Sequence, residues 1–186
     1  QTGVKRIFSD TALRSEPSGR GFEFSSANSI NWGRLCPQIV YYFRAYRMLV
    51  ERGQIRNGEP VNFCVPTGNF GNILAGYYAK MMGLPVAKLI CASNRNRVIS
   101  DFFQTGMYNA NREFFRTISP SMDILISSNL ERFLFEINGH NSADIVSWYD
   151  SLGSSGTFGI DSRLKAQIDS MMLYGWVDED EVHLTI

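Results

Sequence analysis

The residues best suited to chemistry in this chain form one short loop. They lie between an apolar segment at 61–65 and a segment of helical periodicity at 73–82. Glycines let backbone N–H groups approach a bound group without side-chain clash. The first turn of a following helix adds unbonded N–H groups and the positive end of its dipole. This pattern predicts a phosphate-binding site formed by Thr67, Gly68, Asn69, Phe70, Gly71 and Asn72.

The loop differs from two common phosphate-binding motifs. No Gly-Lys-Ser/Thr sequence follows it, so it is not a Walker motif, and it lacks the third glycine of the dinucleotide fingerprint. Taken alone, the loop is equally compatible with a tight turn between a strand and a helix. Both interpretations stay open on the motif itself.

The elements around the loop predict how it is held. A strand at 61–65, a helix ended by Gly83 and a second strand at 86–91 have the lengths of a parallel crossover. Both strands are nearly all apolar, as in a sheet covered on two faces. The predicted fold class is α/β, with an open, mostly parallel sheet flanked by helices and the loop at the carboxyl end of a strand, where such sheets bind ligands.

The remaining elements follow from caps, turn formers and periodicity. Residues 10–28 are rich in turn formers and predict a connector. Four further helices are expected: one long helix begun by Asn28-Ser29 and ended at Gly53, with Pro37 near its start, then helices at 98–104, from Ser128-Asn129 to Gly139, and from Asn141-Ser142. A last helix covers Leu164 to Met172. Short strands are expected near Phe114 and at 122–127, with Asp123 solvated or capping, or near a bound cofactor.

Composition excludes several classes of function. Eighteen basic and eighteen acidic residues cancel, and no basic stripe suggests nucleic acid. No apolar run is long enough for a membrane span. Cys36, Cys64 and Cys91 are too widely spaced for a disulfide framework or a metal site, and we expect small buried side chains in a reducing cytoplasm. His140 is expected in a surface turn.

Four segments in order resemble threonine synthase: 26–34 with 38–43, 65–76, 82–85, and 119–124 with 127–132. The resemblance implies a fold-type-II enzyme that uses pyridoxal 5'-phosphate (PLP) to convert O-phospho-L-homoserine and water to L-threonine and phosphate. It implies that residues 1–25 end a small domain and that 26–186 form part of the large PLP-binding domain. It also implies that Gly68, Asn69, Phe70, Gly71 and Asn72 bind the PLP phosphate through backbone N–H groups, with a hydroxyl from Thr67.

The resemblance also implies what this segment lacks. In the family, the lysine that holds the cofactor covalently lies upstream of any residue here, so no catalytic residue is assigned and the isolated chain is expected to be inactive. Residues 1–8 resemble the middle of a helix, and both ends look cut from a longer protein. The lysines present are expected to be solvated side chains: Lys5, Lys80, Lys88 and Lys165. Asn72 and Arg97 stand where the family often has acidic residues.

Two other readings remain at this point. The strand–loop–helix unit also fits a non-catalytic α/β module that binds phosphate or a nucleotide. The chain is also compatible with a structural piece of a homo-oligomer, for which the aromatic pair Tyr41-Tyr42 would be available, although core packing explains that pair better. The segments at 26–43 and 119–132 favour the enzyme, because a generic phosphate module does not need them.

Overall fold

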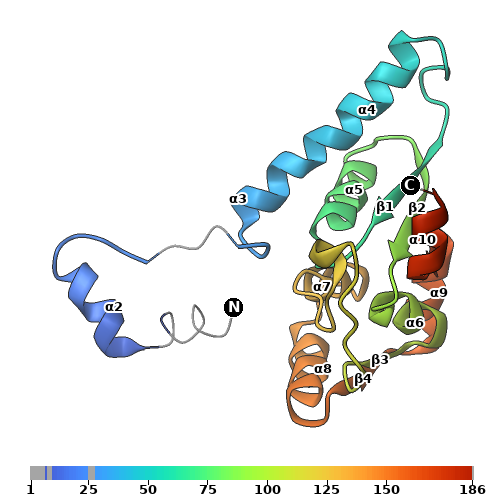
Figure 1. Cartoon of the computed structure of the whole chain (residues 1–186). Coiled ribbons are helices and arrows are strands. Elements are labelled where there is room, and N and C mark those ends of the chain that lie inside the picture. Colours follow the sequence, from blue (N-terminus) through green and yellow to red (C-terminus); the bar gives the residue numbers. More distant parts are fainter. Residues whose placement is uncertain (1–6, 8–9, 25–27, 186) are drawn as a thin grey trace.

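The computed structural model describes residue 7, residues 10–24 and residues 28–185. Figure 1 shows α2 lying apart from a body built by the later elements. In chain order, the elements are α2 (Thr11–Ser18), α3 (Trp32–Leu35), the 3-10 turn η1 (Cys36–Gln38), α4 (Ile39–Glu51), β1 (Val61–Pro66), α5 (Gly71–Met81), β2 (Val86–Ser93), α6 (Val98–Thr105), β3 (Met107–Asn109), the 3-10 turn η2 (Pro120–Met122), α7 (Leu130–Ile137), α8 (Ser142–Ser155), β4 (Thr157–Gly159), α9 (Ser162–Met171), β5 (Met172–Trp176) and α10 (Glu179–Thr185).

The central sheet has three parallel strands in the order β1-β2-β5. Val61 pairs with Val86 at the start of the first ladder, and Leu89 pairs with Met172 at the start of the second. The predicted β1–α5–β2 crossover is therefore confirmed. A small antiparallel pair, β3 with β4, lies below the sheet in Figure 1.

One face of this sheet carries the hydrophobic core. Leu89 and Cys91 on β2 and Tyr174 on β5 point to the same side, because side chains alternate along a strand. Helix α5 approaches this face closely enough that a Cβ atom at Gly76 would lie 3.0 Å from the Leu89 side chain. Helix α6 covers the neighbouring part, where the rings of Phe103 and Tyr174 are 5.9 Å apart.

The opposite face is largely open among the described residues. Cys64, Ile90 and Leu173 lie in register on it, and Leu173 is 49% exposed. The expected covering of both sheet faces is thus not present here. The prediction of three buried cysteines is also wrong. Cys91 faces the core and is buried, Cys64 lies on the open face and is exposed, and Cys36 in η1 is exposed as well.

The predicted long helix is divided in two. It begins at Trp32 rather than near residue 29, because Asn31 accepts a hydrogen bond from the N–H of Gly33 at 2.8 Å and acts as the cap. Pro37 has no N–H to donate, and the chain tightens there into η1 before α4 starts. The chain after α4 then turns at Gly53, which has φ of +67°.

The helices predicted at 98–104, after Asn129 and after Asn141 are confirmed with small changes of boundary. Four other expectations are wrong. The connector at 10–28 contains α2, the short strand expected near Phe114 lies at 107–109, residues 122–127 form no strand, and Met172 begins β5 instead of ending a helix. The predicted helical character of residues 1–8 falls outside the described residues except for Ile7.

Candidate functional site

Residues 67–72, here called the glycine loop, leave the sheet at the carboxyl end of β1. The N–H of Thr67 still donates to the carbonyl of Ala92 at 2.8 Å, so the strand ladder extends into the loop. The Thr67 side chain is buried and its hydroxyl donates to the carbonyl of Val65 at 2.6 Å. This hydroxyl therefore helps to fix the start of the loop.

Phe70 makes the turn into α5. Its φ of +63° lies in the left-handed region, which costs a residue with a side chain about 1–2 kcal/mol. Burial of the ring offsets this cost, because Phe70 is 1% exposed and packs 5.8 Å from the ring of Phe103 and 5.3 Å from that of Phe133. The aromatic anchor therefore determines the direction in which the loop enters the helix.

The carbonyl groups of the loop are bonded on one side. The Ser127 hydroxyl donates to the Gly68 carbonyl at 3.1 Å. Asn129 donates to the Asn69 carbonyl twice, through its backbone N–H at 3.1 Å and through its side-chain amide at 3.0 Å. The segment before α7 thus holds the acceptor groups of the loop away from a ligand.

The N–H groups of the loop stay available. The first hydrogen bond of α5 runs from the N–H of Leu74 to the carbonyl of Phe70 at 3.0 Å. Among the described residues, no acceptor bonds the backbone N–H groups of residues 68–73. The first turn of α5 contains no acidic side chain to compete for them. Unbonded donors at a helix N-terminus form a site for an anion.

Tyr42 of α4 fixes the start of α5 from the side. Its hydroxyl lies 2.8 Å from the carbonyl oxygen of Asn72 and 2.5 Å from the Asn72 side-chain oxygen. Burial raises the pKa of Tyr42 above its ordinary value, so the phenol stays a neutral donor. The side chain of Asn72 is therefore directed at α4, and the loop residue offers a ligand its backbone N–H.

A second segment closes over the loop. Residues 117–123, here called the covering turn, contain η2, and their backbone touches Gly68. A Cβ atom built on Gly68 would lie 2.9 Å from the carbonyl oxygen of Ser121 and 3.2 Å from the Cα of Met122. Only a glycine fits at this position. Gly71 is less confined, since its Cβ would meet the Asn129 side-chain amide at 3.4 Å.

Comparisons with known proteins agree with this geometry. Threonine synthase-like 1 of Macaca fascicularis is 48% identical over 183 residues, which are 97% of this chain and 25% of that protein. Threonine synthase of Methylobacillus glycogenes is 40% identical over 84% of this chain and 32% of its own length. The crystal structure of PLP-bound threonine synthase from Brucella melitensis superposes with a TM-score of 0.87 and 42% identity, covering 98% of this chain and 37% of that one.

In sequence and fold, the chain belongs to the threonine synthase family. The predicted α/β fold with a mostly parallel sheet flanked by helices is confirmed with it. The chain spans about a quarter of the length of the threonine synthase-like 1 relatives that it matches. No family model matches the chain.

Two lysines of this member of the threonine synthase family bond carbonyls near the amino ends of strands. Lys80 donates to the carbonyls of Val86 and Ala87. Lys88 donates to the carbonyls of Asp169 and Ser170. The first two carbonyls lie at the amino end of β2 and the other two in the last turn of α9, just before β5, whereas the loop lies at the carboxyl end of β1. The expectation that both amines are simply solvated is wrong, because each one bonds two backbone carbonyls.

The sequence named Asp123 as a candidate but did not predict the hydrogen bonds that it accepts. Instead of being solvated, its carboxylate accepts hydrogen bonds from Thr117, Asn94 and Asn96. Burial opposes ionisation, but these bonds outweigh it and hold the pKa of Asp123 below its usual range. The partners come from separate segments, and no spacing in the sequence connects them.

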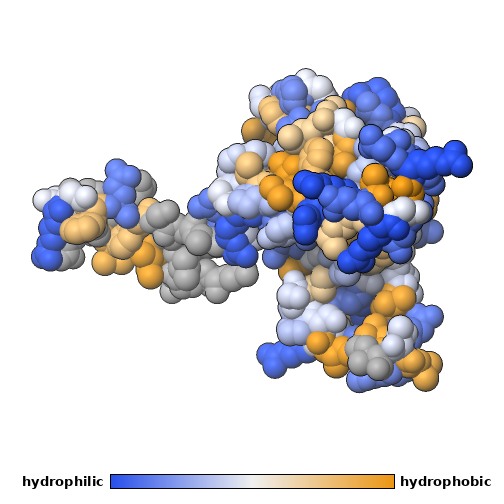
Figure 2. Space-filling model, turned by 90° about the horizontal axis from the view of Figure 1, so that it is seen from above, coloured by the Kyte–Doolittle hydropathy of each residue, from blue (hydrophilic) through white to orange (hydrophobic). Residues whose placement is uncertain are grey.

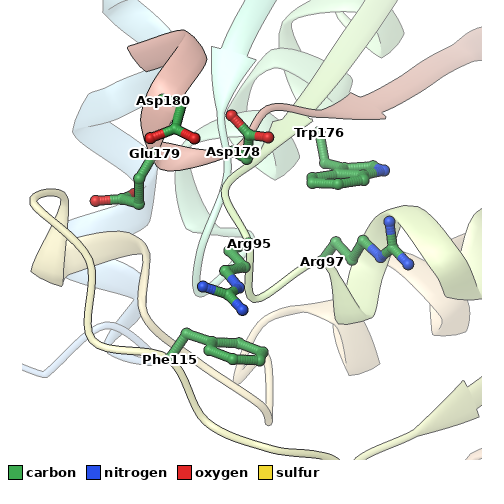
Figure 3. Close-up of a pocket in the computed structure, with 7 residues that line it drawn as sticks. All are labelled: Arg95, Arg97, Phe115, Trp176, Asp178, Glu179 and Asp180. Carbon is green, nitrogen blue, oxygen red and sulfur yellow. The ribbon is translucent and has the colours of Figure 1, made fainter. Parts of the chain in front are cut away.

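A pocket of about 430 Å³ lies beside the covering turn, at the carboxyl ends of β2 and β5. Figure 3 shows two arginines on one side of it: Arg95 lies over the ring of Phe115 at 3.9 Å, and Arg97 lies over Trp176 at 4.2 Å. Three carboxylates line the other side: Asp178, Glu179 and Asp180. Glu179 accepts a hydrogen bond from the N–H of Ile118, which ties α10 to the covering turn.

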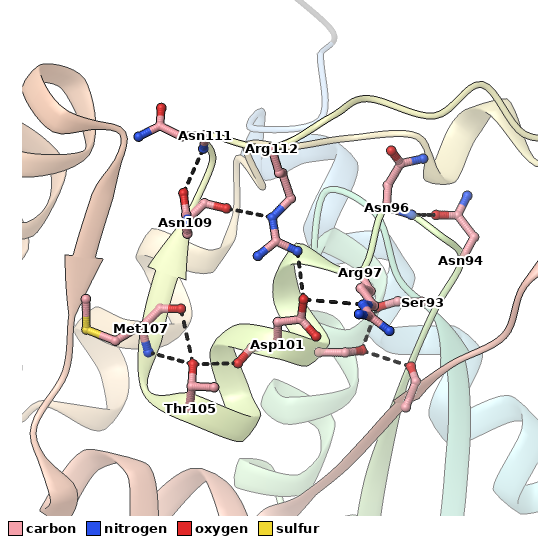
Figure 4. A network of polar contacts seen from close by, with 12 residues as sticks. Ser93, Asn94, Asn96, Arg97, Asp101, Thr105, Met107, Asn109, Asn111 and Arg112 are labelled. Carbon is pink, nitrogen blue, oxygen red and sulfur yellow. Dashed lines mark hydrogen bonds and ion pairs between the residues drawn. The ribbon is translucent and has the colours of Figure 1, made fainter.

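Arg97, which stands where the family often has an acidic residue, pairs with an acidic side chain of α6. Figure 4 shows Asp101 of α6 between two arginines: it forms an ion pair with Arg97 at 3.4 Å and accepts a hydrogen bond from Arg112 at 2.7 Å. The Ser100 hydroxyl of the same helix donates to the hydroxyl of Ser93 at 2.9 Å. The network ties α6 to the loop that follows β3, so Arg97 has a structural partner of its own.

Proposed function

We propose that this chain is part of the cofactor-binding domain of an enzyme that converts O-phospho-L-homoserine and water to L-threonine and phosphate. Residues 26–186 would form part of the large domain, and residues 1–25 would end the small one. The proposal rests on membership of the threonine synthase family together with the unbonded N–H groups of the glycine loop.

The glycine loop fits the phosphate of PLP. Backbone N–H groups of Gly68, Asn69, Phe70, Gly71 and Asn72 would hold it, with the dipole of α5 behind them. Thr67 would contribute by fixing the start of the loop through its bond to Val65. When bound, PLP acts as an electron sink for carbanions formed on the substrate, and the protein supplies position and electrostatics.

We assign no catalytic residue to this chain. Lys80 and Lys88 bond backbone carbonyls near the amino ends of the strands, opposite to the end that carries the loop. Lys165 pairs with Asp169 at 2.6 Å. Lys5 falls outside the described residues. The lysine that holds the cofactor would come from another part of the whole enzyme, and the isolated chain would bind the phosphate group without forming threonine.

The test is a pair of ligands that differ in one group. Pyridoxamine 5'-phosphate lacks the aldehyde, so it forms no imine with surface lysines and reports the phosphate site alone. We expect it to bind in a fluorescence titration, and we expect pyridoxamine, which lacks the phosphate, to bind at least about tenfold more weakly. Equal affinity for the two compounds would remove the phosphate assignment.

The alternative is a non-catalytic module for phosphate or a nucleotide. This alternative would be supported if AMP or inorganic phosphate bound more tightly than pyridoxamine 5'-phosphate in the same assay. Family membership favours the enzyme.

We expect small-molecule ligands as partners and neither nucleic acid nor a membrane. Whether the chain forms a homo-oligomer is a question for a measurement of its mass in solution. None of the helices in the described ranges is long and apolar enough to span a membrane.

A further inference from the structure

The carboxylate of Asp123 joins two loop segments, the turn after β2 and the covering turn. Its Oδ1 accepts from the Thr117 hydroxyl at 2.7 Å, from the Asn94 amide at 2.8 Å and from the Asn96 amide at 3.0 Å. Its Oδ2 accepts from the backbone N–H of Thr117 at 2.9 Å. Bonds to an ionised acceptor are stronger than neutral ones. The carboxylate therefore holds the covering turn against the turn that follows β2.

Hydrogen bonds within the covering turn hold its residues in a fixed arrangement. The N–H of Ser119 donates to the Thr117 hydroxyl at 3.0 Å, and the N–H of Met122 donates to the Ser119 carbonyl at 2.8 Å. Asp123 itself closes η2 through its N–H and the Pro120 carbonyl at 3.3 Å. The seven residues thus form one hydrogen-bonded unit whose two ends meet at the same carboxylate.

The Cα side of Gly68 packs against this unit. The backbone of residues 121–122 lies against its Cα, with Ser121 O only 2.9 Å from where a Cβ would be. Four residues after Asp123, the Ser127 hydroxyl bonds the Gly68 carbonyl. A shift of Asp123 would therefore release the loop on its Cα side, whereas Ser127 is also held by the Tyr108 hydroxyl, which accepts from its N–H at 3.0 Å.

We propose that Asp123 is a positioning residue for the glycine loop: by fixing the covering turn against Gly68, its carboxylate keeps the loop N–H groups aimed at a bound phosphate. The inference rests on the proposed function and adds a residue that makes no contact with the phosphate. Asn in its place keeps the shape but supplies one acceptor oxygen instead of two and sets an amide N–H₂ against a donor.

The test compares Asp123→Asn with a matched control, Asp101→Asn. Asp101 is also partly buried and also anchors a loop, through Arg112, but that loop is the one after β3. The measurements are the dissociation constant for pyridoxamine 5'-phosphate, the amide ¹H–¹⁵N shifts of Gly68 and Asn69, and urea unfolding to confirm that each variant is folded under the binding conditions.

We expect Asp123→Asn to weaken binding about tenfold and to move both amide signals, because a site loses affinity when its supporting bonds are lost. We expect Asp101→Asn to lose stability and keep wild-type affinity and shifts. A purely structural role of Asp123 predicts lower stability with unchanged affinity and amide shifts in the folded variant, and that result would overturn the proposal.

Two further outcomes are also decisive. If Asp123→Asn does not fold, Thr117→Val removes one hydroxyl bond to the carboxylate and leaves the others, and it is expected to give the same changes at smaller size; unchanged affinity and shifts would overturn the proposal. If the wild-type chain does not bind pyridoxamine 5'-phosphate, the proposed function fails, while the amide shifts of Gly68 and Asn69 still show whether Asp123 positions the loop.

Discussion

The hydroxyl of Tyr42 lies 2.5 Å from the side-chain oxygen of Asn72, so one phenol joins α4 to the first turn of α5. The approach is close because Gly76 lies one turn later on α5. A Cβ atom at Gly76 would lie 2.7 Å from the Tyr42 ring. The helix that presents the loop N–H groups is thus held by a side chain 30 residues before Asn72 in the chain.

Tyr42→Phe should remove this link and keep the packing. We expect a loss of about 0.5–1.5 kcal/mol in the free energy of unfolding, the net value of one hydrogen bond. Urea unfolding measures it. Tyr41→Phe is the control, because Tyr41 is 59% exposed on the same helix and should change stability little. Equal effects of the two substitutions would mean that the Asn72 contact contributes nothing.

Gly68→Ala should disrupt the loop from inside. The new methyl group would meet the backbone of residues 121–122, which cannot rotate away as a side chain would. Overpacking of this kind costs about 1–3 kcal/mol, and binding of pyridoxamine 5'-phosphate should fall with it. Gly153→Ala is the matched control, since its Cβ meets nothing within 4 Å and it lies inside α8, where alanine should stabilise the helix.

Gly71→Asp should separate binding from stability. There is room for a Cβ at this position, and an acidic residue in the first turn of a helix is favourable. We therefore expect a folded chain whose carboxylate repels the phosphate and abolishes binding. Gly71→Asn is nearly the same size without the charge and should bind better than the Asp variant. Unchanged affinity of Gly71→Asp in a titration would contradict the loop assignment.

The stability of the chain should depend on pH through Asp123. Folding lowers its pKa below the ordinary 3.8, so its ionised form stabilises the folded state. This contribution is complete above the ordinary value and is lost as the pH falls through the lower folded value. The gap in unfolding free energy between wild type and Asp123→Asn should stay constant from about pH 7 to about pH 5 and narrow below about pH 4. A difference in unfolding free energy that does not change with pH would contradict the lowered pKa of Asp123.

The isolated chain should not make threonine. Incubation with PLP and O-phosphohomoserine should release no phosphate above a buffer control. Borohydride reduction followed by peptide mapping should leave Lys80 and Lys88 without stoichiometric label, because both amines are bonded at the amino edge of the sheet. Stoichiometric label on either lysine would show that covalent chemistry occurs within this chain.

The sequence predicted the part of the fold in which local signals and tertiary contacts agree. The β1–α5–β2 unit has apolar strands, a helix with clear periodicity and glycines at its turns. The cap at Asn141 was also found, because its side chain accepts from the N–H of Ala143. Helix caps, turns and periodicity depend only on neighbours along the chain, so the sequence predicts them correctly here.

The missed features depend on contacts between distant segments. β5 begins within what looked like the last turn of a helix, because Met172 pairs with Leu89 and leaves α9. Asp123 looked like a turn residue, yet its partner amides lie 27 and 29 positions earlier. Asn129 looked like a simple cap, but its side chain reaches the Asn69 carbonyl instead. Such pairings have no local signature.

The two sides of the sheet give this chain a pair of built-in chemical reporters. Cys64 and Cys91 lie on neighbouring strands but face opposite ways, one exposed and one in the core. Burial raises the pKa of the Cys91 thiol to about 12, against a weaker opposite effect of Thr67, so it is almost entirely unreactive while the sheet is intact. In one labelling experiment with a thiol reagent, the labelling rate of Cys64 would therefore measure how accessible the outer face of the sheet is. The labelling rate of Cys91 would measure how fast the sheet opens.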